Sequence, residues 1–400
     1  MKKKHVCFIS AGEHSGDLLA AELFTQLKTR LHRVEAFGIT GAAMRGVGIA
    51  PIASIDDFGF MGFIEILKRL SQLLELESRI LAEIDRRGAN MAILVDFPGF
   101  HFRLAEQLRL RGIKVVQYVA PKLWAWGESR IVRLRRDFNL VLGILPFEEE
   151  FFTSRNVNYK FVGNPQKDRV SKVLVNREAL GLKSNGKIIV CLPGSRQDEV
   201  DRMFPIINSV IMEMRKTHSG LEFIVPMATN LGIEDYSAVF TQINPEEKVI
   251  ASSISGVNSW MWNSIRFLPG MSLEMMSVAD AAIVTSGTAT LECALLGTPL
   301  VVVYATSKMS YEIAKTKVKI TEFSLVNLIA QRKIVTEYIQ YIDVHEVAAE
   351  VTDLISASSS RAKAMKENFQ AIARELNGNA AWMAANAIGE LMDHPAAPLA

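Results

Sequence analysis

The chain has 400 residues, of which 49% are apolar and 22% are charged, a composition typical of a globular protein with two domains and not of a disordered chain. The net charge of +2 is too small to indicate a nucleic-acid-binding protein. The three cysteines are far apart, which is typical of a protein of the reducing cytoplasm, and no uncharged apolar run reaches the roughly 18 residues that would predict a membrane-spanning helix.

Strand and helix signals alternate from the start of the chain. An apolar run predicts a strand at Val6–Ser10, and an apolar stripe predicts a helix over Leu18–Arg30. The turn between them contains Glu13 and Asp17, which would repel an anion, so we do not expect it to bind phosphate. The two carboxylates either begin the helix or line a cleft at the carboxyl end of the strand.

Residues 58–76 follow a second predicted strand at Val34–Gly38 and form a broad apolar stripe at helical spacing. Such a stripe usually faces the protein core. A helix that partly enters the lipid interface, or that admits acyl chains, has the same pattern. The candidate residues for contact with an acylated substrate or with a membrane are Phe60, Phe63, Leu67, Leu70 and Leu74.

A strand predicted at Met91–Asp96 ends on a carboxylate. The active crevice of an open parallel sheet lies at the carboxyl ends of its strands, so Asp96 is a candidate for catalysis; the alternative is a cap on the helix that follows. After the next predicted strand, Lys114–Tyr118, Trp124 and Trp126 lie in a loop. These two side chains either fill the interior of the domain or form an apolar wall of a site.

A second alternating series begins with a predicted strand at Lys187–Leu192, after a crossover turn at Gly163–Pro165. The strand leads into Gly194 and Ser195, which allow the backbone to approach a ligand closely. Arg196 follows, and its permanently charged, planar guanidinium is suited to phosphate. The end of this strand is therefore a candidate phosphate contact.

The segment Ala282–Tyr304 is predicted to form a strand, a tight turn, a helix and a second strand. Ser286, Gly287 and Thr288 occupy the turn, where the first N–H groups of the helix and its positive dipole end favour an anion. One turn into the helix, Glu292 is either a surface charge or an acceptor for ribose hydroxyl groups. Two strand ends with phosphate chemistry in one half of the chain favour a nucleotide diphosphate as the ligand.

Asn327 is a lone polar residue in an apolar run, and it is either a turn former or a hydrogen-bonding contact to a ligand. Residues 252–263 lie between the two candidate phosphate turns, and their sequence predicts only a local elaboration of the second domain. The predicted organisation is a first α/β domain at 1–165, a second at 166–360, closing helices at 361–393 and a flexible tail at 394–400.

The motifs of this chain, taken together and in order, resemble those of bacterial lipid-A-disaccharide synthase, a family of GT-B glycosyltransferases (family 19). The similarity runs from about residue 5 to residue 390. It implies two Rossmann-like, doubly wound α/β domains that face each other across a cleft, followed by closing C-terminal helices. The motifs are Gly12–Asp17, Val95–Phe100, Pro121–Trp126, Leu145–Glu148, Phe161–Pro165, Leu192–Arg196 and Thr285–Glu292.

The resemblance implies an inverting transferase that moves 2,3-diacylglucosamine from UDP-2,3-diacylglucosamine to the 6-hydroxyl of 2,3-diacylglucosamine 1-phosphate (lipid X). The products are lipid A disaccharide 1-phosphate and UDP, and we expect neither a cofactor nor a metal. Asp96 is expected to act as the base, with Glu13 as the second candidate, and His101 stands where asparagine is common in the family. The expected UDP-binding residues are Gly194, Ser195, Arg196, Ser286, Gly287, Thr288, Glu292 and Asn327.

Both substrates carry acyl chains, so the resemblance also implies peripheral association with the cytoplasmic face of the inner membrane of a Gram-negative bacterium. Residues 1–165 carry 23 Lys and Arg against 18 Asp and Glu, a weak positive balance that suits a phosphorylated lipid surface. The family resemblance further favours a homodimer.

Three other functions fit the same pattern. A UDP-N-acetylglucosamine epimerase would share the architecture and the nucleotide turns, but it would not need the apolar stripe at 58–76. A UDP-sugar glycosyltransferase with another acceptor is a closer alternative. The third is a non-catalytic UDP-sugar-binding protein, against which Asp96 and Glu13 argue.

Overall fold

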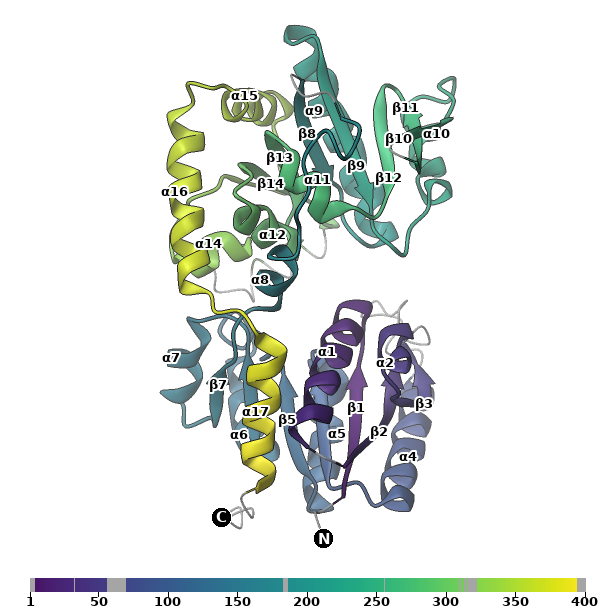
Figure 1. The fold of residues 1–400 in the computed structure, drawn as a ribbon, viewed down its shortest axis with the longest axis vertical. Coiled ribbons are helices and arrows are strands. Elements are labelled where there is room, and N and C mark those ends of the chain that lie inside the picture. Colours follow the sequence, from purple (N-terminus) through teal and green to yellow (C-terminus); the bar gives the residue numbers. More distant parts are fainter. Residues whose placement is uncertain are drawn as a thin grey trace. The chain divides into compact units, whose positions relative to one another are not determined.

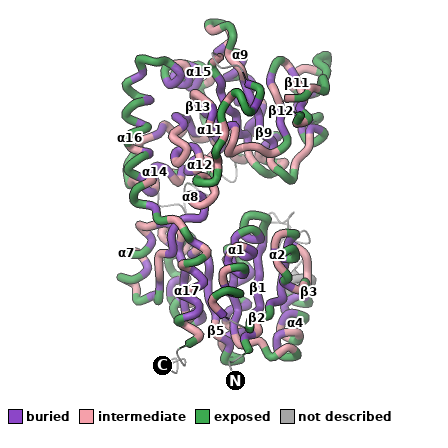
Figure 2. The backbone as a smooth tube through the Cα atoms, in the orientation of Figure 1, coloured by how far each residue is buried: buried purple, intermediate pink, exposed green. Residues whose placement is uncertain are grey.

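The computed structural model describes residues 4–31, 33–55, 70–182, 186–254, 256–308, 311–312, 315 and 322–393. The chain divides into two compact units, one built from 1–165 together with 377–400 and the other from 166–376 (Figure 1). Each unit contains one sheet with helices packed against it. Figure 2 shows that the buried residues are concentrated in the strands of each sheet and on the helix faces that pack against them.

The first unit contains a seven-stranded sheet in which all strands are parallel. Most of its strands are short apolar runs that are buried on both faces, as is usual for a parallel sheet covered by helices. The strands are β1 (His5–Ala11), β2 (Val34–Thr40), β3 (Ala50–Ser54), β4 (Met91–Val95), β5 (Lys114–Tyr118), β6 (Leu140–Gly143) and β7 (Tyr159–Phe161). Their spatial order, β3-β2-β1-β4-β5-β6-β7, is that of a doubly wound fold.

The helices of the first unit pack in two groups, α1 with α2 and α17, and α4 with α5 and α6. Figure 1 shows α1 in front of the sheet and α5 behind it. The last helix, α17, packs along α1, where Gly389 leaves room for the side chain of Arg30. The helices are α1 (His14–Arg30), α2 (Ala42–Gly46), α4 (Leu70–Arg87), α5 (Pro98–Leu110), η2 (Glu128–Arg130), α6 (Ile131–Asp137), α7 (Glu148–Thr153) and α17 (Ala380–Asp393).

The second unit contains an eight-stranded sheet with the spatial order β10-β11-β12-β9-β8-β13-β14-β15. The strands from β12 to β15 along this order are parallel, and β10 and β11 extend the sheet as an antiparallel hairpin. The strands are β8 (Lys187–Leu192), β9 (Leu221–Met227), β10 (Ile250–Ile254), β11 (Val257–Trp262), β12 (Ile265–Pro269), β13 (Ala281–Thr285), β14 (Leu300–Tyr304) and β15 (Glu337–Ile339).

The helices of the second unit include α12, which follows β13 and contacts α11, α14 and α16. The long helix α9 follows β8 in the same way, and α15 packs against it. The helices are α8 (Pro165–Val170), α9 (Gln197–Thr217), η3 (Ile233–Tyr236), α10 (Ser237–Ile243), α11 (Ser272–Val278), α12 (Thr288–Leu296), α14 (Leu325–Ala330), α15 (Val344–Leu354) and α16 (Ser360–Glu375).

The segment 252–263, for which the sequence predicts only a local elaboration, forms most of the hairpin of β10 and β11. Trp262 at the end of β11 is fully buried, and its ring stacks on Phe240 with the centroids 4.5 Å apart. Phe204 of α9 and Phe267 of β12 join the same aromatic cluster. The hairpin is therefore part of the core of the second unit.

The structure corrects the predicted start of the first helix. The sequence predicts a helix from Leu18, but α1 begins at His14 and its N-cap is Glu13, which has an extended backbone. The reason is that the strand β1 continues to Ala11, so the turn is much shorter than predicted. None of the described helices is long and apolar enough to cross a bilayer.

Candidate functional site

The helix α12 begins at a turn that presents backbone N–H groups to solvent. β13 ends at Thr285, and Ser286 leads to Gly287, the N-cap of α12. This cap makes no side-chain hydrogen bond, so the first turn of α12 receives no acceptor from its own cap residue. Gly287 and Thr288 are both exposed. The phosphate turn expected from the sequence thus lies at the surface with the positive end of its helix dipole uncapped.

The corresponding turn before α9 is closed by a glutamate of that helix. Gly194 has φ 128°, which favours glycine, and a Cβ at this position would lie 2.4 Å from the Cβ of Glu199. Glu199 Oε2 accepts hydrogen bonds from the backbone N–H groups of Ser195, at 2.9 Å, and Arg196, at 3.3 Å. The carboxylate therefore occupies the N–H groups that the sequence assigns to phosphate.

Arg196 is the group at this second turn that can reach an incoming anion. Its side chain is exposed, and its guanidinium lies 3.6 Å from the carboxylate of Glu199. An ion pair with one exposed partner adds little stability, so an anion can compete for the guanidinium at small cost. The two turns of the second unit therefore differ in chemistry: α12 offers backbone N–H groups, whereas the turn before α9 offers an exposed guanidinium.

Glu292 lies one turn into α12 and is partly buried. Burial raises the pKa of its carboxyl group, and the positive charge of Arg169 in α8 opposes this rise. The side chain is thus placed on the same helix as the open turn, where a partly desolvated carboxylate can accept hydrogen bonds from hydroxyl groups. This position fits the ribose contact that the sequence offers as one of its two alternatives.

Asn327 is fully buried, and its side-chain amide is engaged within the second unit. Its oxygen accepts hydrogen bonds from the backbone N–H groups of Ile334, at 2.8 Å, and Val335, at 3.0 Å. Its nitrogen donates to the carbonyl of Val335 at 2.9 Å and to Glu337 at 2.8 Å. These contacts correspond to the turn-forming alternative, because they leave the amide no remaining hydrogen for a ligand.

Glu337, which the sequence does not single out, connects this region to the open turn. Its carboxylate accepts hydrogen bonds from the backbone N–H groups of Phe323, at 2.9 Å, and Ser324, at 2.8 Å. The carbonyl of Phe323 in turn accepts a hydrogen bond from Ser286 Oγ at 3.3 Å. Asn327 is thus linked to the turn before α12 through Glu337 and the loop at Phe323.

In the first unit, Asp96 directly follows β4 and is exposed. Asp96 and Phe97 both have φ 52°, a left-handed conformation that costs a non-glycine residue on the order of 1–3 kcal/mol. The N–H of Asp96 donates to the carbonyl of Tyr118 at 3.0 Å, which continues the pairing of β4 with β5 by one residue. The turn is therefore held by the sheet on one side, at the carboxyl end of β4.

The other side of this turn is held by a buried imidazole. His101 Nδ1 lies 2.6 Å from the carbonyl oxygen of Asp96, and Nε2 lies 2.9 Å from Ser10 Oγ. Complete burial lowers the pKa of His101 to about 3, so the ring is neutral at physiological pH. A neutral ring with its proton on Nδ1 donates to Asp96 and accepts from Ser10.

Glu13, the second candidate base, lies on a loop that touches the turn of Asp96. A Cβ at Gly12 would lie 2.3 Å from Cγ of Phe97, so the two loops are in direct contact there. Glu13 follows Gly12 and is exposed, as Asp96 is. The structure thus places both candidate carboxylates at the same edge of the first sheet, at the carboxyl ends of β1 and β4.

Asp17, the other acidic residue of this loop, has a different role. It is buried, and its carboxylate accepts hydrogen bonds from the backbone N–H groups of Gly41, at 2.7 Å, Ala43, at 2.9 Å, and Met44, at 3.1 Å. The side chain therefore caps the N-terminus of α2 and does not line a cleft. The contact spans 24 to 27 residues of sequence, so local sequence patterns do not reveal it.

The two tryptophans of the loop after β5 are in different environments. Trp124 is partly buried, and its Nε1–H donates to Glu148 Oε1 at 3.0 Å. Trp126 is 48% exposed, and the guanidinium carbon of Arg130 lies 4.2 Å from its ring centroid. The first ring is therefore anchored in the unit, whereas the second presents an apolar face to solvent.

Of the five apolar residues proposed for acyl or membrane contact, Leu74 lies in α4 and is 39% exposed. Phe60, Phe63 and Leu67 lie outside the described residues, as does the side chain of Leu70. In the part of the chain that the structure describes, no group of three or more His, Cys, Asp and Glu side chains is arranged to hold a metal ion.

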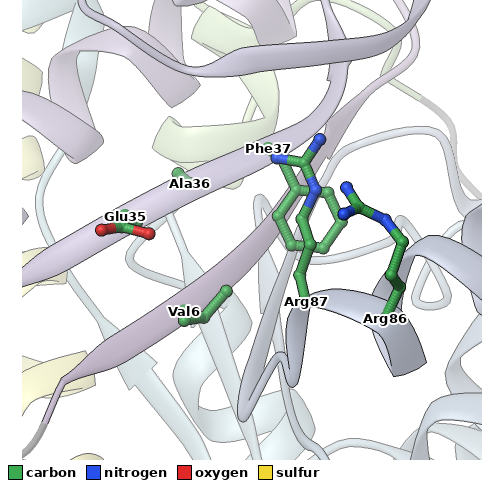
Figure 3. Close-up of a pocket in the computed structure, with 6 residues that line it drawn as sticks. All are labelled: Val6, Glu35, Ala36, Phe37, Arg86 and Arg87. Atoms are coloured by element: carbon green, nitrogen blue, oxygen red, sulfur yellow. The ribbon is translucent and has the colours of Figure 1, made fainter.

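A pocket of about 450 Å³ lies beside the first halves of β1 and β2, away from the candidate site residues (Figure 3). The guanidinium of Arg87 lies over the ring of Phe37 at 4.5 Å, and both Arg86 and Arg87 donate to Glu83. The cations of this pocket thus already have a carboxylate partner. None of the residues that the sequence singles out lines it.

The family model described as lipid-A-disaccharide synthetase matches residues 7–388. The chain is 35% identical over 359 residues to a lipid-A-disaccharide synthase of Anaeromyxobacter sp. (strain K), with 88% of each chain covered. It is 31% identical over 385 residues to that of Citrobacter koseri, with 95% of this chain and 96% of the relative covered.

Solved structures with much lower sequence identity share the fold. The UDP-GlcNAc 2-epimerase of Neisseria meningitidis bound to UDP-GlcNAc matches with a TM-score of 0.57 at 11% identity and covers 98% of this chain and 99% of its own. The calicheamicin glycosyltransferase CalG4 matches with a TM-score of 0.59 at 12% identity and 98% coverage of each chain. These likenesses confirm the predicted GT-B fold of two Rossmann-like units.

Proposed function

The chain belongs to the lipid-A-disaccharide synthase family, and we propose that it transfers 2,3-diacylglucosamine from UDP-2,3-diacylglucosamine to the 6-hydroxyl of 2,3-diacylglucosamine 1-phosphate. The products are lipid A disaccharide 1-phosphate and UDP. The donor is α-linked and the product is β-linked, so a single displacement with inversion at C1 suffices. The observation that carries the proposal is the uncapped N-terminus of α12, which offers N–H groups to a leaving diphosphate.

The diphosphate of UDP binds at Ser286, Gly287 and Thr288. The N–H groups of this turn are fixed by the helix, so they need no rearrangement as negative charge develops on the leaving group. Arg196 approaches the same diphosphate from the turn before α9, and its ion pair with Glu199 is exchanged for one with phosphate. Gly194 and Ser195 shape that turn, while Glu199 keeps their backbone in place.

The ribose of UDP binds next to Glu292, on the same helix as the diphosphate. A ribose hydroxyl is a neutral donor, and a carboxylate in a partly dry environment is a strong acceptor for it. Asn327 contributes indirectly, because its amide and Glu337 hold the loop whose carbonyl at Phe323 receives the hydroxyl of Ser286.

Asp96 acts as the general base, with Glu13 as the second candidate. The base removes the proton of the acceptor 6-hydroxyl while the oxygen attacks C1 of the donor sugar. Support comes from the place of Asp96 at the carboxyl end of β4 and from the rigidity of its turn, which His101 and Tyr118 hold from two sides. The nearby loop of Glu13 supplies a second carboxylate at the same edge of the sheet.

The acceptor and the acyl chains bind to the first unit, at its apolar side chains. Trp124 and Trp126 form a wall beside the acceptor sugar. Residues 58–76, which include Phe60, Phe63, Leu67, Leu70 and Leu74, contact acyl chains and the surface of the cytoplasmic leaflet of the inner membrane. The protein acts as a peripheral membrane enzyme and as a homodimer.

One experiment separates this function from its alternatives. The protein is incubated with UDP-2,3-diacylglucosamine and lipid X, and the products are analysed by mass spectrometry for a tetraacyl disaccharide 1-phosphate and UDP. A parallel reaction contains UDP-N-acetylglucosamine alone and is followed by ¹H NMR of the sugar, because an epimer has the same mass as the substrate. The proposal predicts product in the first reaction only. Conversion of the sugar in the second reaction would indicate an epimerase, and binding of UDP without either conversion would indicate a non-catalytic protein.

A further inference from the structure

Glu148 is a buried carboxyl group beside the proposed acceptor site to which no role in the reaction is yet assigned. It is the first residue of α7, and it is only 2% exposed. Most carboxylates that are buried to this extent have a charged partner or several hydrogen bonds. Glu148 is held by hydrogen bonds, and they come from three different segments of the first unit.

The two carboxylate oxygens of Glu148 have different partners. Oε1 accepts a hydrogen bond from Trp124 Nε1 at 3.0 Å. Oε2 accepts from the hydroxyl of Tyr159 at 3.2 Å, and this hydroxyl also lies 3.3 Å from the carbonyl oxygen of Leu145. The ring of Phe147 meets that of Trp124 edge-on, with the centroids 5.0 Å apart. The carboxyl group therefore joins the loop 120–126 to β7 and to the start of α7.

Gly143 provides the room for this arrangement. A Cβ at this position, the last of β6, would lie 1.6 Å from the hydroxyl oxygen of Tyr159. Any side chain here would therefore push the phenol away from Glu148. A glycine at the end of β6 and a tyrosine at the start of β7 are thus both required for the carboxyl group to have its second partner.

The charge of Glu148 is balanced so that it changes near neutral pH. Burial raises its pKa to about 7, while hydrogen bonds from Trp124, from Tyr159 and from the backbone of Leu145, together with the positive charge of Lys122, oppose the rise. Lys122 belongs to the same loop as Trp124 and is exposed. The other charged neighbour is Glu149 of α7, which is also exposed.

We propose that Glu148 is a positioning residue of the transferase: it holds the Trp124 indole in place as a wall of the acceptor site, and the gain of a proton by its carboxyl group loosens that hold. The inference rests on the proposed function, because it takes the loop 120–126 as part of the acceptor site. It assigns Glu148 no contact with either substrate.

The network accommodates the proton without leaving a polar group unpaired. A proton on Oε2 is donated to the hydroxyl oxygen of Tyr159, whose own hydrogen then turns to the carbonyl of Leu145. Oε1 continues to accept from Trp124, but it is now the oxygen of a neutral acid. A hydrogen bond to a charged oxygen is roughly twice as strong as one to a neutral oxygen. Acidification therefore weakens the anchor of the indole and does not break it.

The test uses the full-length protein and combines a spectroscopic readout with kinetics. The five tryptophans are labelled with ¹⁵N at the indole nitrogen, and the resonance of Trp124 is identified by its loss in Trp124→Phe. Glu148→Gln keeps an oxygen for the indole but cannot ionise. Glu148→Leu removes the hydrogen bonds to both Trp124 and Tyr159 along with the rest of the carboxyl group, and Glu149→Gln is the matched control on the exposed face of the same helix.

The proposal predicts that the Nε1–H shift of Trp124 titrates in the wild type with a midpoint at about 7, as the pKa of Glu148 does, and that Glu148→Gln abolishes this titration. Glu148→Leu should move the resonance at every pH and raise the KM for the acylated acceptor by about tenfold, with the KM for the UDP donor changed less than about twofold. Glu149→Gln should behave as the wild type. Should Glu148→Leu not fold, the comparison of Glu148→Gln with the wild type still decides the titration.

Two results would overturn the proposal, and they are distinct from a failure of the proposed function. If the Trp124 resonance is the same in all variants and at all pH values, Glu148 does not hold the indole. If the resonance moves but the acceptor KM does not, the loop is not part of the acceptor site. If no disaccharide forms even in the wild type, the proposed function fails, while the resonance still tests the link between the two side chains.

Discussion

His101 Nδ1 lies 2.6 Å from the carbonyl oxygen of Asp96, so a buried neutral imidazole fixes the backbone of the residue proposed as base. The same ring reaches Ser10 of β1 through Nε2, at 2.9 Å. The left-handed turn at Asp96 and Phe97 is thus tied to the centre of the sheet. Rigidity of this kind is what a general base needs, because its oxygen must stay within hydrogen-bond reach of the hydroxyl that it deprotonates.

The burial of His101 predicts an acid-sensitive fold. Its pKa is about 3 in the folded protein but about 6.5 when the chain is unfolded, so between about pH 6.5 and pH 3 only the unfolded state takes up the proton. The free energy of unfolding should fall by about 1.4 kcal/mol for each pH unit between pH 6.5 and about pH 3, and the contribution of His101 should be constant above pH 6.5. Urea denaturation of the wild type and of His101→Asn between about pH 7.5 and pH 4.5 measures the difference.

Asparagine can donate to the carbonyl of Asp96 but does not titrate, so His101→Asn should lack this part of the pH dependence. His218→Asn, at the protein surface, is the control and should follow the wild type. An unchanged slope in His101→Asn would mean that the imidazole is not buried as a neutral ring.

The assignment of Asp96 as base predicts a loss of turnover without a loss of nucleotide binding. Asp96→Asn has nearly the same shape, but its amide cannot accept the proton of the acceptor hydroxyl. The kcat should fall by about 10²–10⁴-fold, and the Kd for UDP by titration calorimetry should stay within about twofold of the wild type. Turnover near that of the wild type would exclude Asp96 and would make Glu13→Gln the next variant to measure.

Arg196 is predicted to contribute to UDP affinity through its charge and its planar fork. Arg196→Ala should raise the Kd for UDP by about 10–100-fold, as expected for a hydrogen bond to a charged group. Arg196→Lys keeps the charge but loses the planar guanidinium, so its Kd for UDP should lie between those of the wild type and Arg196→Ala. The assignment fails if Arg196→Ala binds UDP as tightly as the wild type does.

The apolar residues at 58–76 are predicted to bring the protein to a lipid surface. A variant with serine at Phe60, Phe63 and Leu67 should co-sediment less with vesicles that contain an anionic phospholipid, because apolar burial at the interface drives such binding. Leu174→Ser is a matched control, since Leu174 is 90% exposed and belongs to the second unit. Equal sedimentation of the wild type and the triple variant would remove this segment as the membrane contact.

Much of the fold was predictable because its strands are short apolar runs buried on both faces. The strands at Lys114–Tyr118 and Lys187–Leu192 have the predicted bounds. Ala50–Ser54 was not predicted, because this edge strand contains a proline and is only partly buried. The hairpin of β10 and β11 is not predicted for a related reason, because Ser252, Ser253 and other polar residues interrupt its apolar pattern.

The candidate site was predictable where the chemistry is local and unpredictable where it depends on distant partners. Ser286, Gly287 and Thr288 could be found because a turn between a strand and a helix is a local pattern. Glu199 lies only four residues from Ser195. An acidic residue in the first turn of α9 is therefore a local signal that the backbone N–H groups before this helix already have a carboxylate acceptor. Glu337 could not be found in this way, because it acts on Phe323 from another element, 14 residues away.

We propose that backbone N–H groups at the start of α12 bind the diphosphate of UDP, and Thr288→Pro tests this most directly. Proline is well tolerated at the first position of a helix, and the extended backbone of Gly287 is compatible with a following proline, so the variant removes one N–H group and keeps the helix. Thr288→Ala keeps the N–H group and is the control. Titration calorimetry should show a Kd for UDP about tenfold or more higher for Thr288→Pro, and a Kd within about twofold of the wild type for Thr288→Ala. A folded Thr288→Pro protein that binds UDP as tightly as Thr288→Ala would contradict the claim.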